Sequence, residues 1–429
     1  MPKYIVEGGV PLSGRIRPAG NKNAALPIIC ATLLSEEPVR LENVPDIRDV
    51  RTLLELMQQL GCSVEWEGSD TVTIHAREIR ISEVDRSLAA RIRASILLAG
   101  PMLARVGSML LPPPGGDVIG RRRVDTHFLA FQRLGARVET AGGYHLEADS
   151  LTGAEIFLDE PSVTATENAI MAAALARGTT RLRNAAAEPH VQDLCRMINA
   201  LGGRISGIGT HVLEIEGVER LGGGSFKIGS DHIEVGSFIG LAAVTRGDIV
   251  IEDAAVEHLD STLLAFDRLG IRCEAQGQDL RVPADQDLDI RMDLGGHIPK
   301  IDDGPWPAFP ADLTSIALVV ATQCRGTILI HEKMFESRMF FADKIIGMGA
   351  RIVLCDPHRA VVVGPSRLYA GVMETPDIRA GMALLIAALS AEGESHMYNI
   401  QQVERGYAAI DQRLKQLGAR ITREDSRGD

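Results

Sequence analysis

Arg133-Leu134-Gly135-Ala136-Arg137-Val138-Glu139 is one copy of a phrase that occurs six times along the sequence, with small changes. The other copies begin at Gln59, Ala200, Arg268, Gly347 and Gln416. Each phrase follows a stripe of apolar residues spaced three and four apart, so we expect its central glycine to close a helix in the left-handed conformation and lead into a strand. The glycines are 67 to 79 residues apart, which is too long for a solenoid repeat and predicts six similar α/β units.

Each unit contains a second helical segment of a different kind, apolar on nearly every side. A helix that is apolar all round is buried, so each unit should combine one central helix with one half-exposed helix, joined by strands. The expected buried helices are residues 23–34, 93–104, 166–176, 234–245, 312–323 and 378–389.

Six units divide naturally into three plus three, and a chain of 429 residues is too long for one ordinary core. A glycine-rich stretch from Leu221 to Ser230 lies near the expected boundary. We therefore predict one domain at 21–229, with repeats one to three, and a second domain formed by 1–20 plus 230–429, with repeats four to six. The first strand, at residues 3–8, is expected to pair in the second domain, which would make the crossover double.

Composition limits the classes of function. With 57 acidic and 45 basic residues the net charge is −12, which argues against non-specific binding to nucleic acid or to an anionic membrane. The six cysteines include no C-x-x-C pair, so neither a metal site nor a redox motif is expected. The N-terminus lacks a signal-peptide core and no apolar run is long enough to span a membrane, so we expect a cytoplasmic protein. Neither a P-loop nor a dinucleotide fingerprint is present, and no cofactor is predicted.

Polar residues gather at the expected N-terminal ends of the buried helices. Free N–H groups and the helix dipole favour anions there, and several such ends together would form an anion-binding cleft between the domains. These residues are Asn21, Lys22 and Asn23; Arg91 and Arg93; Thr166, Glu167 and Asn168; Asp231, His232 and Glu234; Asp312; and Asp377 with Arg379. Arg338 and Arg405 stand just before half-exposed helices.

The segment 111–123, Leu-Pro-Pro-Pro-Gly-Gly-Asp-Val-Ile-Gly-Arg-Arg-Arg, has the composition of a lid. Prolines stiffen its approach, Gly115 and Gly116 free the backbone, and Asp117 stands five residues before Arg122. Closure of such a loop over an anionic substrate would expel water and strengthen these charges.

Seven motifs are spread along the chain: Pro18 to Pro27, Arg93-Ala-Ser, Pro114 to Asp125, Pro307-Ala-Phe-Pro-Ala-Asp, Phe335-Glu-Ser-Arg, Asp377-Ile-Arg-Ala and Glu404-Arg-Gly-Tyr. Together these motifs resemble the enolpyruvyl transferases, over nearly the whole chain. Asn21-Lys22-Asn23-Ala24 stands where relatives acting on shikimate 3-phosphate usually have a Ser-Lys-Ser signature, which favours the branch acting on a UDP-sugar. The resemblance implies two domains of three βαβαββ units each, in an inside-out α/β arrangement, with the active site in the cleft.

The implied reaction moves the enolpyruvyl group of phosphoenolpyruvate to the 3′-hydroxyl of UDP-N-acetylglucosamine and releases phosphate, the first committed step toward peptidoglycan. C3 of the enol is protonated, the sugar oxygen attacks C2, and phosphate leaves. By resemblance, Lys22, Arg122 and Arg405 hold the phosphate, Arg338 and Arg379 the carboxylate, Asp312 lies against the 3′-hydroxyl, and Asp377 joins the charged cluster. Asn23, Arg93, Arg123, Val124, Asp125, Thr126, Glu160, Pro161, Ser162, Val163 and Met334 line the UDP-sugar site, with Phe335 beside it.

The sequence departs from the family pattern at several positions. Asp117 stands where most members have cysteine, and a carboxyl of ordinary pKa, about 3.9, donates a proton only if burial raises that pKa. Its role as the acid at C3 is open, and we predict that fosfomycin, which alkylates the thiol, will not inactivate this protein. Arg123 replaces a usual proline, Ala187 an arginine, and Glu404 an aspartate.

Two alternatives follow from these departures. The acceptor could be another nucleotide sugar or a small hydroxylated compound, or the chain could be a weakly catalytic binding or regulatory relative. His127 either touches the sugar or faces a core, and Trp306 is expected to anchor the loop before Asp312.

Overall fold

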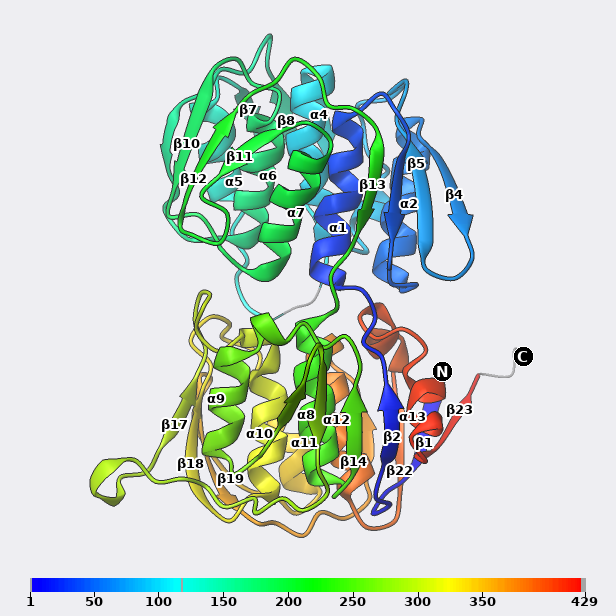
Figure 1. The fold of residues 1–429 in the computed structure, drawn as a ribbon, viewed down its shortest axis with the longest axis vertical. Coiled ribbons are helices and arrows are strands. Elements are labelled where there is room, and N and C mark those ends of the chain that lie inside the picture. The colour runs from blue at the N-terminus through cyan, green and yellow to red at the C-terminus, as the bar shows by residue number, and fades with distance from the viewer. Residues whose placement is uncertain (1, 117–118, 426–429) are drawn as a thin grey trace. The chain divides into compact units, whose positions relative to one another are not determined.

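The computed structural model describes residues 2–116 and 119–425, which divide by their contacts into two compact units (Figure 1). Unit 1 comprises Met1–Ala19, Val118–Arg121 and Ser230–Asp429, and unit 2 comprises Gly20–Asp117 and Arg122–Gly229. The chain therefore passes between the units after Ala19 and again after Gly229, and the segment 118–121 groups with unit 1.

Unit 2 holds the first three repeats. The first contains α1 Lys22–Ala31, η1 Thr32–Leu34, β3 Val39–Glu42, α2 Arg48–Leu60, β4 Ser63–Glu67 and β5 Thr71–His75. The second contains α3 Arg86–Ala89, η2 Arg93–Leu98, α4 Ala99–Val106, β6 Ser108–Leu111, α5 Asp125–Arg133, β7 Arg137–Glu139 and β8 Tyr144–Glu147. The third contains β9 Glu155–Phe157, α6 Val163–Ala173, β10 Thr179–Arg183, α7 Pro189–Ala200, β11 Arg204–Ser206 and β12 Val212–Glu216, and β13 Gly224–Lys227 follows it.

Unit 1 begins with β1 Lys3–Glu7 and β2 Ser13–Ile16 and then holds the last three repeats. The fourth contains α8 His232–Val244, β14 Asp248–Ile251, η3 Val256–His258, α9 Asp260–Arg268, β15 Glu274–Gln276 and β16 Asp279–Val282. The fifth contains η4 Leu294–Gly296, β17 Lys300–Asp302, η5 Ala311–Leu313, α10 Thr314–Gln323, β18 Gly326–His331, α11 Ala342–Gly347, β19 Arg351–Asp356 and β20 Arg359–Gly364. The sixth contains β21 Val372–Glu374, α12 Ile378–Ser390, β22 Glu394–Tyr398, η6 Ile400–Arg405, α13 Ile410–Gln416 and β23 Arg420–Glu424.

Each repeat forms its own small sheet. Within the described residues five sheets have four strands, and the sheet of the second repeat has three, in the order β6-β8-β7. Two sheets take their parallel edge strand from a distant segment: β13 pairs with β3, and β2 pairs with β14. The glycine-rich stretch expected near the boundary is thus partly a strand of unit 2 rather than a free linker. The strand itself is Gly-Ser-Phe-Lys, and its single glycine does not prevent backbone pairing.

The first strand closes the last repeat. β1 lies between β22 and β23 and is antiparallel to both, with Tyr4 opposite Met397 and Arg423. The predicted pairing of the first strand with the second half of the chain is confirmed. As a result the sixth sheet gains the fourth strand that its own repeat lacks.

The six phrase glycines have the predicted conformation. Gly61, Gly135, Gly202, Gly270, Gly349 and Gly418 all have positive φ angles, between 76° and 109°. Each follows or ends one of the half-exposed helices, where the last carbonyl groups need a left-handed residue to turn the chain into the next strand. The prediction of left-handed caps is therefore confirmed at all six positions.

The predicted buried helices are also confirmed, with differences at the starts of three of them. The second begins as the 3₁₀ segment η2 before it continues as α4, and the fifth begins as η5 before it continues as α10. The third, α6, begins at Val163 because the Ser162 hydroxyl accepts a hydrogen bond from the N–H of Ala165 at 3.4 Å. The expectation that Thr166, Glu167 and Asn168 open this helix is wrong, since they lie inside it and are buried. A pattern of residue types predicts where a helix lies more accurately than it predicts the residue at which the helix begins.

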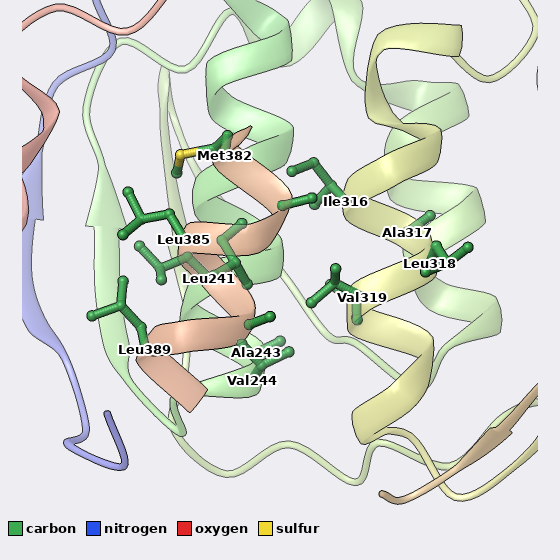
Figure 2. Close-up of a cluster of buried hydrophobic side chains, with 14 of the residues drawn as sticks. Leu241, Ala243, Val244, Ile316, Ala317, Leu318, Val319, Met382, Leu385 and Leu389 are labelled. Carbon is green, nitrogen blue, oxygen red and sulfur yellow. The ribbon is translucent and has the colours of Figure 1, made fainter. Parts of the chain in front are cut away.

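The core of unit 1 is formed where α8, α10 and α12 meet (Figure 1). Leu241, Ile316, Val319 and Leu385 are among the buried side chains that fill this contact (Figure 2). Close approach of α8 to α10 depends on Gly240, where a Cβ atom would lie 2.8 Å from the Cγ2 of Ile316. Helices this apolar contribute most of the fold's stability by removing nonpolar surface from water.

None of the helices described, in either stretch of the chain, combines the length and the nonpolar character needed to cross a lipid bilayer.

Candidate active site

Asp312 is the centre of a buried charged cluster in unit 1. It lies in η5, and its Oδ1 accepts a hydrogen bond from Nη2 of Arg338 at 3.0 Å. Its Oδ2 accepts two from Arg379, at 3.1 Å from Nε and 2.9 Å from Nη2. The arginine side chains are only 3% and 6% exposed, whereas the Asp312 side chain is 26% exposed. One accessible carboxylate therefore joins two enclosed guanidinium groups, and such charge-assisted hydrogen bonds are strong.

Arg379 is held from several sides. Asp377 is the N-cap of α12 and accepts hydrogen bonds from the backbone N–H groups of Arg379 and Ala380 at 2.9 and 3.0 Å. The Nη1 of Arg379 lies 3.3 Å from the Tyr407 hydroxyl, which is 3.0 Å from the Ser237 hydroxyl. Burial by itself would lower the pKa of Arg379, but Asp312, Tyr407 and Asp231 together raise that pKa above its ordinary value, so the guanidinium remains charged.

Arg338 and Arg405 occupy the segments expected from the sequence. Arg338 stacks on the ring of Phe335, with 5.0 Å between its Cζ and the ring centroid. Arg405 ends η6 and donates a hydrogen bond to Oε1 of Gln402 at 2.9 Å. Met334 is exposed. The N–H of Ser337 donates to the carbonyl oxygen of Ile119 at 3.1 Å, so Ile119 of the lid contacts the loop that carries Arg338.

In unit 2, Lys22 is paired with an acidic residue that the sequence did not single out. Its Nζ lies 2.9 Å from Oδ2 of Asp49, and the two side chains are 11% and 6% exposed. Asn21 caps α1 by accepting hydrogen bonds from the N–H groups of Asn23 and Ala24 at 2.9 and 3.1 Å. Asp49 lies in the first turn of α2, and its burial beside Lys22 is visible only in the structure.

Arg93 and Arg122 form a second cationic group in unit 2. The Nη2 of Arg93 donates to the carbonyl oxygens of Arg122 and Arg123 at 2.7 and 3.2 Å. Burial, together with the neighbouring charge of Arg122, lowers the pKa of Arg93 to about 10. Two arginines this close repel each other, and a bound anion would remove that repulsion.

Arg123 belongs to an acidic turn. Its guanidinium contacts Asp159 at 2.8 Å, Asp125 at 3.3 Å and Glu160 at 3.7 Å. The Thr126 hydroxyl donates to Oδ1 of Asp159 at 2.7 Å. Asp159 thus links the segment 123–126 to 160–163, and the pair of adjacent acids at 159–160 was the signal that could have drawn attention to it.

Of the other predicted residues, Ser162 caps α6, Val163 is its first residue, Pro161 precedes the cap and Val124 precedes α5. Asp117 lies outside the described residues. On the lid before it, a Cβ atom at Gly115 would lie 1.7 Å from the carbonyl oxygen of Ala90, and Gly116 has a φ of 103°. Both glycines are therefore required by the path of the loop.

Burial decides between the two roles considered for His127. His127 has no exposed surface, and its ring nitrogens lie 3.1 Å from the Thr164 hydroxyl and 2.8 Å from the Asn168 amide. It is a core histidine, and burial lowers its pKa to about 3. Trp306 packs its ring edge-on to His232 and His258, with centroid separations of 6.2 and 6.3 Å. In the part of the chain that the structure describes, no three His, Cys, Asp or Glu side chains are grouped to hold a metal ion.

The sequence matches a known family of enzymes along nearly its whole length. The model of the EPSP synthase (3-phosphoshikimate 1-carboxyvinyltransferase) family matches residues 6–424. The chain belongs to this family of enolpyruvyl transferases. It is 61% identical over 421 residues to a UDP-N-acetylglucosamine 1-carboxyvinyltransferase of Bradyrhizobium diazoefficiens, covering 98% of each chain. A protein of the same name from Treponema denticola is 56% identical, with 98% of this chain and 99% of the relative covered.

The fold of these enolpyruvyl transferases is also found among solved structures. The enolpyruvyl transferase NikO from Streptomyces tendae superimposes with a TM-score of 0.87 at 25% identity, covering 99% of each chain. The predicted inside-out α/β fold class and the resemblance to the enolpyruvyl transferases are confirmed.

Proposed function

We propose that this enolpyruvyl transferase moves the enolpyruvyl group of phosphoenolpyruvate to the 3′-hydroxyl of UDP-N-acetylglucosamine and releases phosphate, the first committed step of peptidoglycan synthesis. The observation that carries the proposal is the Asp312 carboxylate held between Arg338 and Arg379. The names of the relatives that are 61% and 56% identical support the choice of acceptor. A cytoplasmic location is part of the same proposal.

Two groups of cationic residues are proposed to bind the two anionic ends of phosphoenolpyruvate. Arg338 and Arg379 bind the carboxylate of phosphoenolpyruvate, since planar guanidinium groups match a carboxylate geometrically. Lys22, Arg122 and Arg405 hold the phosphate and stabilise the charge that grows on it as it leaves. Asp312 takes the proton of the attacking hydroxyl, because its carboxylate is partly exposed whereas the arginines that it contacts are buried.

The sugar half of the site is proposed to be formed by Asn23, Arg93 and the linked segments 123–126 and 160–163. Asp159 positions both segments through Arg123 and Thr126. Asp117 remains the proposed residue of the lid, either as the acid at C3 or as a contact that completes closure.

The test is phosphate release by the purified protein with phosphoenolpyruvate and UDP-N-acetylglucosamine, with and without fosfomycin. Release that requires both substrates and continues in the presence of the drug is expected. Arg379→Lys should lower kcat/KM at least 100-fold, because lysine cannot bridge Asp312 and Tyr407 through a planar fork. Arg367→Lys is the matched control, since Arg367 makes an exposed ion pair with Glu392.

A second acceptor is favoured by one observation. Arg123 replaces a usual proline and carries a charge that three acidic residues compensate, so the sugar-binding turn differs from the family pattern. A panel of other nucleotide sugars and hydroxylated acceptors, run beside UDP-N-acetylglucosamine, separates the two. Release with another acceptor alone would refute the first assignment and leave the reaction class standing.

A further inference from the structure

Behind the Asp312 cluster, unit 1 contains a group of buried polar atoms without hydrogen-bond partners. They are Oε2 of Glu332, Oδ2 of Asp303, Nε of Arg338 and Oγ1 of Thr314. Glu332 has no exposed surface and Asp303 is 1% exposed. Unpaired polar atoms at such depth are costly, so several of them in one place call for a specific explanation.

The partnered atoms of the same two carboxyl groups hold the loop that carries Arg338. Oε1 of Glu332 accepts hydrogen bonds from the N–H groups of Met334 and Phe335 at 3.3 and 3.1 Å. Oδ1 of Asp303 accepts one from the N–H of Lys333 at 2.5 Å. Arg338 stacks on Phe335, and its Nε lies 3.6 Å from Oε2 of Glu332. Both carboxyl groups thus support the turn from which Arg338 reaches Asp312.

The charges in this region do not balance if both carboxyl groups are ionised. Burial raises the pKa of Glu332 to about 9, Asp303 adds to the rise, and Arg338 opposes it. The Thr314 hydroxyl at the start of α10 also faces this carboxyl and lowers its pKa, and Nδ1 of His358 lies 2.7 Å from the backbone carbonyl oxygen of Glu332. Arg338 is already shared with Asp312. Two buried like charges cannot both be neutralised by one arginine that also serves a third carboxylate.

We propose that Glu332 and Asp303 share one proton between their unpaired oxygens, and that this pair positions Arg338 for the carboxylate of phosphoenolpyruvate. The shared proton satisfies both oxygens and leaves the pair with a single negative charge. A second charge there would attract the guanidinium away from Asp312. This inference rests on the proposed function, in which Arg338 binds the substrate carboxylate.

Steady-state kinetics of Glu332→Gln and Glu332→Ala test the positioning role. Glutamine keeps the size of the protonated acid and can donate to Asp303, so kcat and the KM for phosphoenolpyruvate should stay within threefold of wild type. Alanine should raise the KM for phosphoenolpyruvate at least tenfold and leave the KM for the acceptor within twofold. Asp302→Asn is the matched control, because Asp302 is next to Asp303 but pairs with Lys300 and Lys333 at the surface. A glutamine variant as defective as the alanine variant, or an alanine variant with unchanged KM, would overturn the role.

The proton itself is measured without turnover. In protein labelled with ¹³C at the glutamate carboxyl groups, the resonance lost in Glu332→Gln identifies Glu332. Its chemical shift should be that of a protonated carboxyl at pH 7, and the shift of an ionised group there would refute the shared proton. If wild-type protein releases no phosphate with UDP-N-acetylglucosamine, the proposed function fails, whereas the NMR result still decides the state of the pair.

Discussion

Replacing Asp312 by asparagine tests the central cluster most directly. The carboxylate accepts three hydrogen bonds from Arg338 and Arg379, at 3.0, 3.1 and 2.9 Å. Asparagine keeps the shape but offers only one oxygen, so one of the two buried guanidinium groups then faces an amide that cannot accept from it. The variant should therefore lose stability and activity together.

The size of the stability effect follows from burial. Removing one partner of a buried ion pair costs about 3–5 kcal/mol, which we reduce to roughly 2–3 kcal/mol because Asp312 is partly exposed and keeps one acceptor. For a unit of this size that corresponds to a fall in Tm of roughly 4–12 °C. Loss of a general base should lower kcat by about 10²–10⁴-fold.

Differential scanning calorimetry and phosphate-release kinetics measure the two effects on the same preparation. Asp285→Asn is the control, because Asp285 makes a 2.9 Å ion pair with Arg272 while its side chain is 80% exposed. Exposed pairs contribute about 0–1 kcal/mol, so this variant should keep its Tm and activity. An Asp312→Asn variant with a wild-type Tm would show that the buried arginines do not depend on this carboxylate. One with wild-type kcat would remove Asp312 from the proton transfer.

Three further predictions use other parts of the molecule. Burial lowers the pKa of His127 to about 3, so as the pH falls the unfolded chain binds a proton on this histidine before the folded protein does, and the free energy of unfolding should fall between about pH 6.5 and pH 3, by up to about 1.4 kcal/mol per pH unit. Urea unfolding at several pH values should show a weaker pH dependence of this free energy in His127→Gln. An unchanged pH dependence would contradict the assignment of His127 as a buried neutral histidine. Gly61→Ala should lower the free energy of unfolding by about 1–3 kcal/mol, and by more than Gly418→Ala does. Both glycines have a positive φ, but a Cβ atom at Gly61 would lie 2.9 Å from the Glu78 carbonyl oxygen, whereas a Cβ atom at Gly418 would meet no atom of the described residues. Equal losses of stability in thermal unfolding of the two variants would show that this contact is unimportant. Asp49→Asn should raise the KM for phosphoenolpyruvate roughly 10-fold, because the Lys22 ammonium loses the 2.9 Å contact that positions it; this change corresponds to about 1.4 kcal/mol of binding free energy. An unchanged KM in steady-state kinetics would show that Lys22 does not bind the phosphate.

The sequence was sufficient to predict the six helix ends and the buried layer, which depend on local pattern. The six glycines predicted the helix ends, since only a residue without a Cβ adopts their positive φ at little cost. Helices apolar on all sides predicted the buried layer that α8, α10 and α12 form. The motifs around Lys22, Arg122 and Arg379 resemble those of the enolpyruvyl transferases, and the match to that family confirms the resemblance.

Only the tertiary structure decided which charges compensate each other. The structure pairs Asp49 with Lys22, and Asp159 with Arg123 and Thr126, although these residues come from separate elements. No periodicity in the chain marks one acid among its 57 Asp and Glu residues as a partner. The start of α6 was misplaced for a related reason, since the hydrogen bond of one serine decides it. Local pattern determines secondary structure and burial because it repeats along the chain. Charge pairing depends on distances across the fold, and these exist only once the elements have packed.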